Sequence, residues 1–207
     1  MNNQYLIIFS LICLFSCGLQ SKKEEQGNSS TPPIQVVVKK TKPKQNINLQ
    51  IEESATIGDT LQIVSTQKML YFPFGIHSGI KDYLKELPLK ISLKEKVREN
   101  MPVYFIEYNK SIIEVLLGED PFGKNELLVN IVKAEIMDNQ INLFNNIQVG
   151  VSKQFFSDFF NLNKTLRSNQ IRVVEFVSAL SGIWYYYTFD ENDILKKIEI
   201  KSDYVFE

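Results

Sequence analysis

Cysteine is scarce in this chain of 207 residues, and both cysteines, Cys13 and Cys17, lie within the first 17 positions. The remainder of the chain therefore cannot hold a disulfide framework or a cysteine-based zinc site. Histidine occurs once, as His77, which excludes a His-rich transition-metal site as well. We expect neither a metal centre nor a cofactor.

An excess of charge of either sign is also missing. The chain has 23 Lys and Arg against 24 Asp and Glu, for a formal net charge of −1. A nucleic-acid-binding protein needs a basic patch or a high pI, so we expect no nucleic-acid partner. The hydrophobic fraction of 44% is too high for a disordered chain, and the length suits one domain or two small ones.

Long hydrophobic runs are missing too. The run Leu6–Phe15, interrupted only by Ser10, falls short of the about 20 residues that span a membrane. Its length is typical of the hydrophobic region of a signal peptide. Polar residues follow from Gly18 onward, and Met1–Gln4 contains no Lys or Arg. The N-terminus therefore predicts a signal peptide, although its first residues are less basic than usual.

The end of this run resembles the lipobox of bacterial lipoproteins. Leu14 supplies the aliphatic residue, Ser16 the small residue and Cys17 the cysteine, whereas Phe15 is bulkier than usual. The resemblance implies cleavage between Ser16 and Cys17 and lipidation of Cys17, whose acyl chains then anchor the protein in a membrane. The alternatives are an ordinary secretory signal cleaved nearby and a buried hydrophobic strand.

The segment that follows has the composition of a tether. Gln20–Gln45 contains Lys and Glu clusters, Pro32–Pro33 and the basic run Lys39–Lys44, and Val36–Val38 is its one apolar run. Such a segment buries too little apolar surface to offset the entropy of ordering, so we expect it to be flexible. The run Lys23–Glu25 resembles the export signal of surface lipoproteins of Bacteroidetes type.

These features divide the chain into three segments. We expect a lipoprotein signal peptide at 1–16, a lipidated cysteine with a flexible tether at 17–45, and one folded domain at 46–207. The expected location is the cell envelope, with the lipid anchor in the outer membrane and the domain either periplasm-facing or surface-exposed.

Two helices are predicted in the domain. Ser78–Leu87 places apolar residues on one helical face, with Ser78 as the N-cap and Pro88 after the last residue. Ser152 is a second candidate N-cap, and it precedes Phe155–Phe160, whose four phenylalanines form one wide helical face. We expect that face to lie in the core.

Strands are predicted in most of the remaining apolar runs. Short links such as Ser181–Gly182 and Asp190–Asp193 favour an antiparallel meander in the last third. The sequence therefore predicts an α+β fold, in which an antiparallel sheet packs against about two helices. The predicted strands lie in Ile47–Ile51, Leu61–Ile63, Met69–Phe72, Val103–Tyr108, Ile112–Leu117, Leu127–Ile136, Ile141–Phe144, Ile171–Val177, Ile183–Phe189 and Ile194–Ile200.

A faint internal similarity links two parts of the domain. Val103–Val115 and Trp184–Ile198 each combine an aromatic strand with a second strand, and each follows a predicted helix that begins with Ser. Two related helix-plus-sheet halves are one explanation. A general likeness among aromatic hairpins is the other.

The last third also resembles a known family. Gly150–Ser152, Trp184–Tyr185 and Ile194–Ile198 resemble the small outer-membrane lipoproteins that assist β-barrel assembly, whose fold is like that of β-lactamase inhibitor protein. The resemblance covers 147–201 and lacks the usual Gly-x-Pro step, because Asn161–Asn163 stands there. It implies an accessory or inhibitor-like module, and the whole chain resembles envelope lipoproteins of Bacteroidetes type.

Three short motifs invite a chemical interpretation. Gly118–Lys124 has P-loop spacing, but Asn125 replaces the required Ser or Thr and Pro121 has no N–H, so we expect a loop between strands. His77 lies between glycines, which favours a loop leading into a helix over a Ser-His-Asp triad. Asp190–Asp193 offers oxygen ligands for Ca²⁺ but lacks the EF-hand pattern, which favours an acidic hairpin turn.

The strand Ile183–Phe189 carries large rings on both of its faces. It is either a core strand whose second face meets a helix, or a platform on which Trp184 and Tyr186 stack against a glycan. Because no catalytic constellation is found, we expect a non-enzymatic binding module with an envelope protein or glycan as partner. The alternatives are an accessory module in outer-membrane protein assembly and an envelope hydrolase with an unrecognised site.

Overall fold

The computed structural model describes residues 47–88, 90–120, 126–143, 147–162, 166, 170–179 and 182–204. Contacts divide the chain into the units Met1–Lys40 and Thr41–Glu207, and every described residue belongs to the second unit. The predicted signal peptide, its cleavage site at Ser16 and Cys17, and the predicted tether lie outside the described residues. They remain predictions from the sequence.

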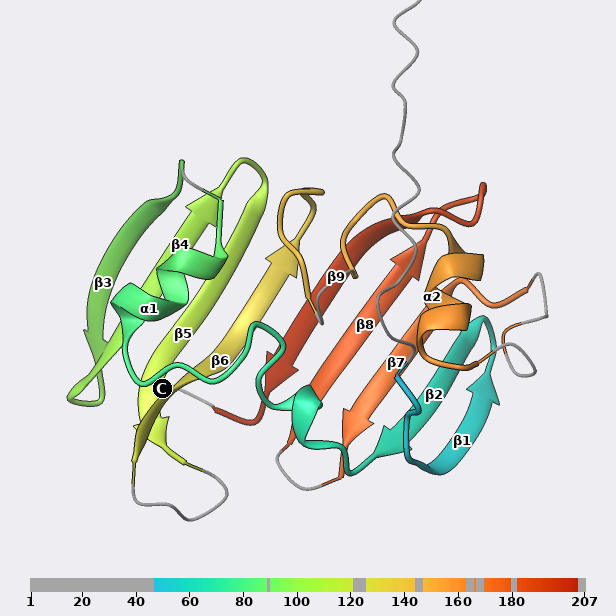
Figure 1. Ribbon diagram of the computed structural model, residues 1–207, viewed down its shortest axis with the longest axis horizontal. Coiled ribbons are helices and arrows are strands. Elements are labelled where there is room, and N and C mark those ends of the chain that lie inside the picture. The colour runs from blue at the N-terminus through green and yellow to red at the C-terminus, as the bar shows by residue number, and fades with distance from the viewer. Residues whose placement is uncertain are drawn as a thin grey trace, which may run out of the picture. The chain divides into compact units, whose positions relative to one another are not determined.

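A nine-stranded sheet dominates the described part of the chain (Figure 1). Strands account for 51% of the described residues and helices for 12%, so the fold is mostly β and the predicted α+β class is wrong. The strands are β1 (Ile51–Ile57), β2 (Thr60–Ser65), β3 (Ser92–Arg98), β4 (Met101–Tyr108), β5 (Ser111–Glu119), β6 (Leu127–Ile136), β7 (Val173–Ser178), β8 (Ile183–Phe189) and β9 (Leu195–Ser202).

The strand order is β1-β2-β7-β8-β9-β6-β5-β4-β3. Strands β3 to β6 form one antiparallel meander and β7 to β9 form another, and the two join where β9 pairs with β6. The hairpin of β1 and β2 is added at the far end, where β2 runs parallel to β7. The predicted meander of the last third is confirmed, but the sheet as a whole is mixed rather than antiparallel.

The helices are shorter than the sequence predicts. The segment Ser78–Leu87 forms one α-helical turn, α1 (Ile80–Tyr83), followed by the 3₁₀ turn η2 (Leu84–Glu86). Gly79 rather than Ser78 occupies the N-cap position, and no side chain caps the helix. A single uncapped turn is stabilised by little hydrogen bonding of its own, so its position depends on Tyr83, which is buried in the core.

Helix α2 (Lys153–Phe159) begins where the sequence predicts. The hydroxyl of Ser152 accepts a hydrogen bond from the backbone N–H of Phe155 at 3.1 Å, so the predicted N-cap is confirmed. Phe156 is fully buried and its ring lies 4.8 Å from that of Tyr187 and 5.4 Å from that of Phe189. The aromatic face of α2 therefore belongs to the core, as predicted.

Three predicted strands are wrong, and two strands, β3 and all but the first residue of β1, were missed. In the predicted strand Ile141–Phe144, residues 141–143 form only an isolated bridge, between Leu143 and Ile147. Residues 47–50 form no strand, since the N–H of Ile47 instead donates to the carbonyl of Phe159 at 2.8 Å. The segment Met69–Phe72 overlaps the 3₁₀ turn η1 (Lys68–Leu70). Strand β3 escaped prediction because it is an edge strand rich in Lys and Glu, and its residues are nearly all exposed.

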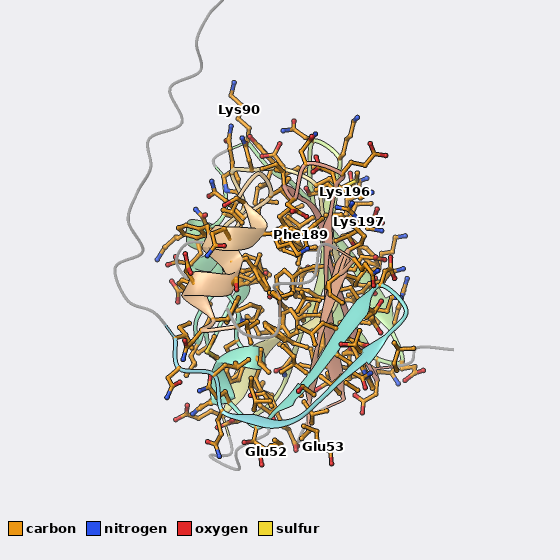
Figure 2. The ribbon with its side chains drawn as sticks, turned by 90° about the vertical axis from the view of Figure 1, so that its right-hand side faces the viewer. Glu52, Glu53, Lys90, Phe189, Lys196 and Lys197 are labelled. Carbon is orange, nitrogen blue, oxygen red and sulfur yellow. The ribbon has the colours of Figure 1, made fainter. Side chains whose placement is uncertain are left out.

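Both α-helices lie on one side of the sheet. Figure 2 shows the sheet from its β1 edge, with Phe189 between α2 and the sheet and Lys197 on the other side. We call the side that carries no described helix the uncovered face. The opposite side, the covered face, holds the main hydrophobic cluster, to which both α-helices and seven of the strands contribute buried residues.

Candidate functional site

Strand β8 has two unlike faces. Tyr185 and Tyr187 point into the core and are fully buried, whereas Trp184 and Tyr186 lie half-buried on the uncovered face. The expectation that a helix covers this second face is therefore wrong for the described part of the chain. The two predicted binding residues share one face because they are two positions apart in a strand.

The pairing register places Trp184 in a row of side chains that crosses the uncovered face. Trp184 is opposite Lys201 on β9, Lys201 is opposite Lys133 on β6, and Lys133 is opposite Glu114 on β5. Directly opposed residues on neighbouring strands have Cβ atoms about 5 Å apart, so their side chains are in reach of one another. We call these four residues the central row.

A second row beside it is acidic. Glu175, Tyr186, Glu199 and Glu135 are opposed in turn across β7, β8, β9 and β6. The row continues to Glu107 on β4 through a single apolar position on β5. Four carboxylates therefore lie in one line, which we call the acidic row.

Ion pairs compensate part of this charge. Lys94 lies 2.7 Å from Glu107, and Lys197 lies 2.8 Å from Glu199. Both pairs are partly exposed, so each contributes little to stability. The difference in charge between the central row and the acidic row therefore remains, because neither ion pair includes Lys133 or Lys201 of the central row.

Arg98 forms the best-buried ion pair on the face. Its guanidinium lies 2.9 Å from Glu114, whose side chain is 12% exposed. The same guanidinium lies over the ring of Phe105, at 5.2 Å from the centroid. Phe105 also packs against a small buried cluster of Val103, Leu116 and Val132 on the uncovered face.

A hollow of about 490 Å³ opens over the central row. It lies beside the cation–π contact in which the ammonium of Lys201 is 4.9 Å from the centre of the Tyr186 ring. The carboxylate of Glu114 also faces the hollow. Its lining residues are Arg98, Glu114, Val132, Lys133, Lys201, Ser202 and Tyr204.

The phenol of Tyr186 stays protonated at neutral pH. Burial raises its pKa above the ordinary value of 10, and the charge of Glu175 and a hydrogen bond to that carboxylate raise it further. Gln62 donates a second hydrogen bond to Glu175 at 2.9 Å. The ring of Tyr186 is therefore held at a fixed position beside Trp184.

Sequence reasoning missed the residues around Trp184. Arg98, Glu114, Lys133 and Lys201 are charged residues at outward strand positions, which usually indicates nothing more than solvation. Period-two alternation places each of them on an outer face. The pairing of β6 with β9 brings Lys133 and Lys201 together, and no pattern within either strand reveals that pairing.

His77 makes contacts that position the loop before α1. Its Nε2 lies 2.8 Å from the carbonyl oxygen of Phe74, and its ring meets the edge of Tyr83 at 5.6 Å. Its own carbonyl accepts a hydrogen bond from the N–H of Val129 at 2.9 Å. The predicted loop before α1 is confirmed, and these contacts hold it against β6.

Of the two other motifs, Asp190–Asp193 forms a turn, as predicted, whereas most of Gly118–Lys124 lies outside the described residues, and Gly118 and Glu119 belong to β5. The N–H of Asp120 donates to the carbonyl of Glu126 at 2.9 Å, which closes a hairpin between β5 and β6, while 121–125 lie outside the described residues. Asp190 Oδ1 accepts hydrogen bonds from the N–H groups of Asn192 and Ile194. Its carboxylate therefore caps the acidic turn between β8 and β9.

The described residues bring together no group of three or more His, Cys, Asp or Glu side chains that could hold a metal ion. Over the same residues, no helix has the length and apolar character needed to cross a membrane.

Comparison with known proteins gives this chain no relative. No protein-family model, no curated protein and no solved structure matches it. The resemblance of residues 147–201 to lipoproteins that assist barrel assembly therefore stays a prediction from the sequence.

Proposed function

We propose that the protein is a lipid-anchored envelope lipoprotein whose domain binds a glycan through the uncovered face of its sheet, without catalysis. The observation that carries this proposal is the position of Trp184 and Tyr186, two half-buried rings on a face that no described helix covers. Aromatic rings offer sugars a flat apolar surface, while the neighbouring charged groups supply hydrogen bonds to hydroxyls.

The rigidity of the platform supports this function. Trp184 and Tyr186 lie on β8, which is paired on both sides along its whole length, and the alternate residues of β8 are buried. Side chains held by a central strand lose little conformational freedom when a ligand binds. A binding surface therefore exists before the ligand arrives.

The test measures glycan binding by the full chain in detergent on an immobilised glycan panel. We expect Trp184→Ala to weaken binding at least about tenfold, which corresponds to the loss of one stacking contact. Phe155→Ala is the matched control, because Phe155 is a half-buried aromatic residue on α2. Equal binding by wild type and Trp184→Ala would contradict the proposal.

The same preparation separates the alternatives. Recovery of barrel-assembly subunits from solubilised envelope, in place of glycan binding, would favour the accessory role. Turnover of a glycan that one carboxylate substitution abolishes would instead indicate a hydrolase.

The proposed anchor has its own test. Labelled palmitate is expected in the wild-type protein and absent from Cys17→Ala, because Cys17 is the proposed lipidation site. Label that persists in the variant would show that the anchor lies elsewhere or that none exists.

A further inference from the structure

The hollow on the uncovered face carries surplus positive charge. Arg98, Lys133 and Lys201 line it together with one carboxylate, Glu114. Arg98 lies 2.9 Å from Glu114 and balances its charge. Among the described residues, Lys133 and Lys201 have no carboxylate oxygen within 4.0 Å, so both lysines line the hollow without an ion-pair partner, and the Lys201 ammonium lies over the Tyr186 ring beside it.

The two lysines lie beside the aromatic residues of β8. Lys133 and Lys201 are directly opposed, and Lys201 is directly opposed to Trp184. Because neighbouring strands are about 4.8 Å apart, a short oligosaccharide on the Trp184 ring would be long enough to reach both lysines. Ser202 and Tyr204 add hydroxyl groups at the same hollow.

The acidic row restricts where an anion can lie. Glu135, Glu175 and Glu199 lie on the side of the central row that is away from the hollow. A polyanion that extends from the central row over the acidic row would be repelled by these carboxylates. A short acidic oligosaccharide that lies along the central row avoids this repulsion.

We propose that the hollow binds the carboxylate of an acidic sugar, so that the ligand of this face is an acidic oligosaccharide. The carboxylate accepts charge-assisted hydrogen bonds from Lys133 and Lys201, and a neighbouring sugar ring packs on Trp184. This inference rests on the proposed function, since it names the class of glycan that the uncovered face binds.

The experiment compares a short oligogalacturonate with the galactose oligomer of equal length, by calorimetric titration into the full chain in detergent. We expect the acidic oligomer to bind at least about tenfold more tightly, and its affinity to fall as NaCl concentration rises. The galactose oligomer should show no comparable dependence on salt.

Matched variants locate the effect. Lys133→Gln and Lys201→Gln should each lower affinity for oligogalacturonate about tenfold, whereas Lys133→Arg and Lys201→Arg should retain it. Lys94→Gln is the control, since it removes the same charge from the same face but lies at the β3 edge and pairs with Glu107. Thermal unfolding confirms that each variant is folded.

Each other outcome decides against the inference in a distinct way. Equal affinity for the two oligomers, lost in Trp184→Ala, would overturn the acidic-sugar inference and leave the proposed function standing. Absence of binding to either oligomer and to the whole glycan panel would overturn both. Lysine-dependent binding to phosphatidylglycerol vesicles without oligosaccharide binding would overturn the inference and indicate a lipid surface instead.

Discussion

The two faces of β8 differ in what surrounds similar side chains. Tyr187 on the covered face is ringed by phenylalanines, with Phe156 at 4.8 Å and Phe176 at 5.4 Å between ring centroids. Tyr186, its neighbour on the uncovered face, is surrounded by Lys201 and carboxylates. The same strand thus supplies the core on one side and an available polar and aromatic surface on the other.

From this difference we expect the covered face to provide most of the stability and the uncovered face to provide the proposed binding surface. Buried apolar area stabilises a fold by about 25 cal/mol for each Å², so fully buried rings dominate the free energy of unfolding. Half-exposed rings and exposed ion pairs contribute far less. Substitutions on the two faces should therefore change different measured quantities.

The largest effect is expected in the middle of the covered face. Phe156→Ala should lower the free energy of unfolding by about 3–5 kcal/mol, because it leaves a cavity among four aromatic neighbours. Urea unfolding measures the change. Phe155→Ala on the same helix is the control and should cost less than half as much, so equal losses would contradict this account of the core.

Alkaline pH should lower the free energy of unfolding through the buried tyrosines of the covered face. Burial raises the pKa of Tyr83, Tyr185 and Tyr187 well above the ordinary value of 10. Above pH 10 the unfolded chain releases these phenolic protons while the folded chain keeps them, so stability is full below pH 10 and falls as pH rises. The expected loss is about 1.4 kcal/mol per tyrosine for each pH unit above 10.

Urea unfolding between pH 8 and about 11 measures this slope. In Tyr187→Phe one of the three buried phenols is absent, so the decline should be shallower by about a third. A slope identical in the wild type and the variant would show that other groups cause the alkaline loss.

Two buried tyrosines should respond differently to the loss of a hydroxyl. The hydroxyl of Tyr185 donates to the carbonyl of Leu70, so Tyr185→Phe should cost about 1 kcal/mol. The hydroxyl of Tyr187 is buried without a hydrogen-bond partner among the described residues. Tyr187→Phe should therefore leave stability unchanged or raise it, and urea unfolding at pH 7 that ranks the two variants in the opposite order would contradict the assignment.

The smallest effect is expected on the uncovered face. Lys94→Gln and Lys197→Gln each break one partly exposed ion pair, so each should change the free energy of unfolding by less than about 1 kcal/mol. The difference should shrink further in 1 M NaCl. If either substitution lowered the free energy of unfolding as much as Phe156→Ala does, the claim that stability resides mainly in the covered face would be contradicted.

Local patterns in the sequence were sufficient for part of the fold. The bounds of β8, the N-cap at Ser152 and the burial of Phe156 and Phe159 in α2 depend on residues close together in the chain, and the structure confirms them. The α+β class was wrong because the helix predicted from Ser78 is one turn long and because the edge strand β3, with only Leu93 and Val97 as apolar residues, was not recognised.

Local patterns in the sequence could not predict which strands pair when they are far apart in the chain. The parallel contact of β2 with β7 joins strands more than 100 residues apart, as the hydrogen bond between Gln62 and Glu175 shows. The central row likewise depends on the pairing of β6 with β9. Trp184 and Tyr186 could be proposed from one strand, whereas Lys133 and Lys201 became candidates only once the sheet order placed them together.

Trp184 is the one tryptophan of the chain, so tryptophan fluorescence reports on the uncovered face alone. The most direct test of that face as the binding surface is a fluorescence titration of the full chain with oligogalacturonate. The account predicts a saturable change in tryptophan emission, with the same midpoint as the calorimetric titration and a weaker midpoint in Lys201→Gln. Calorimetric binding without any change in tryptophan emission would place the ligand elsewhere and contradict the account.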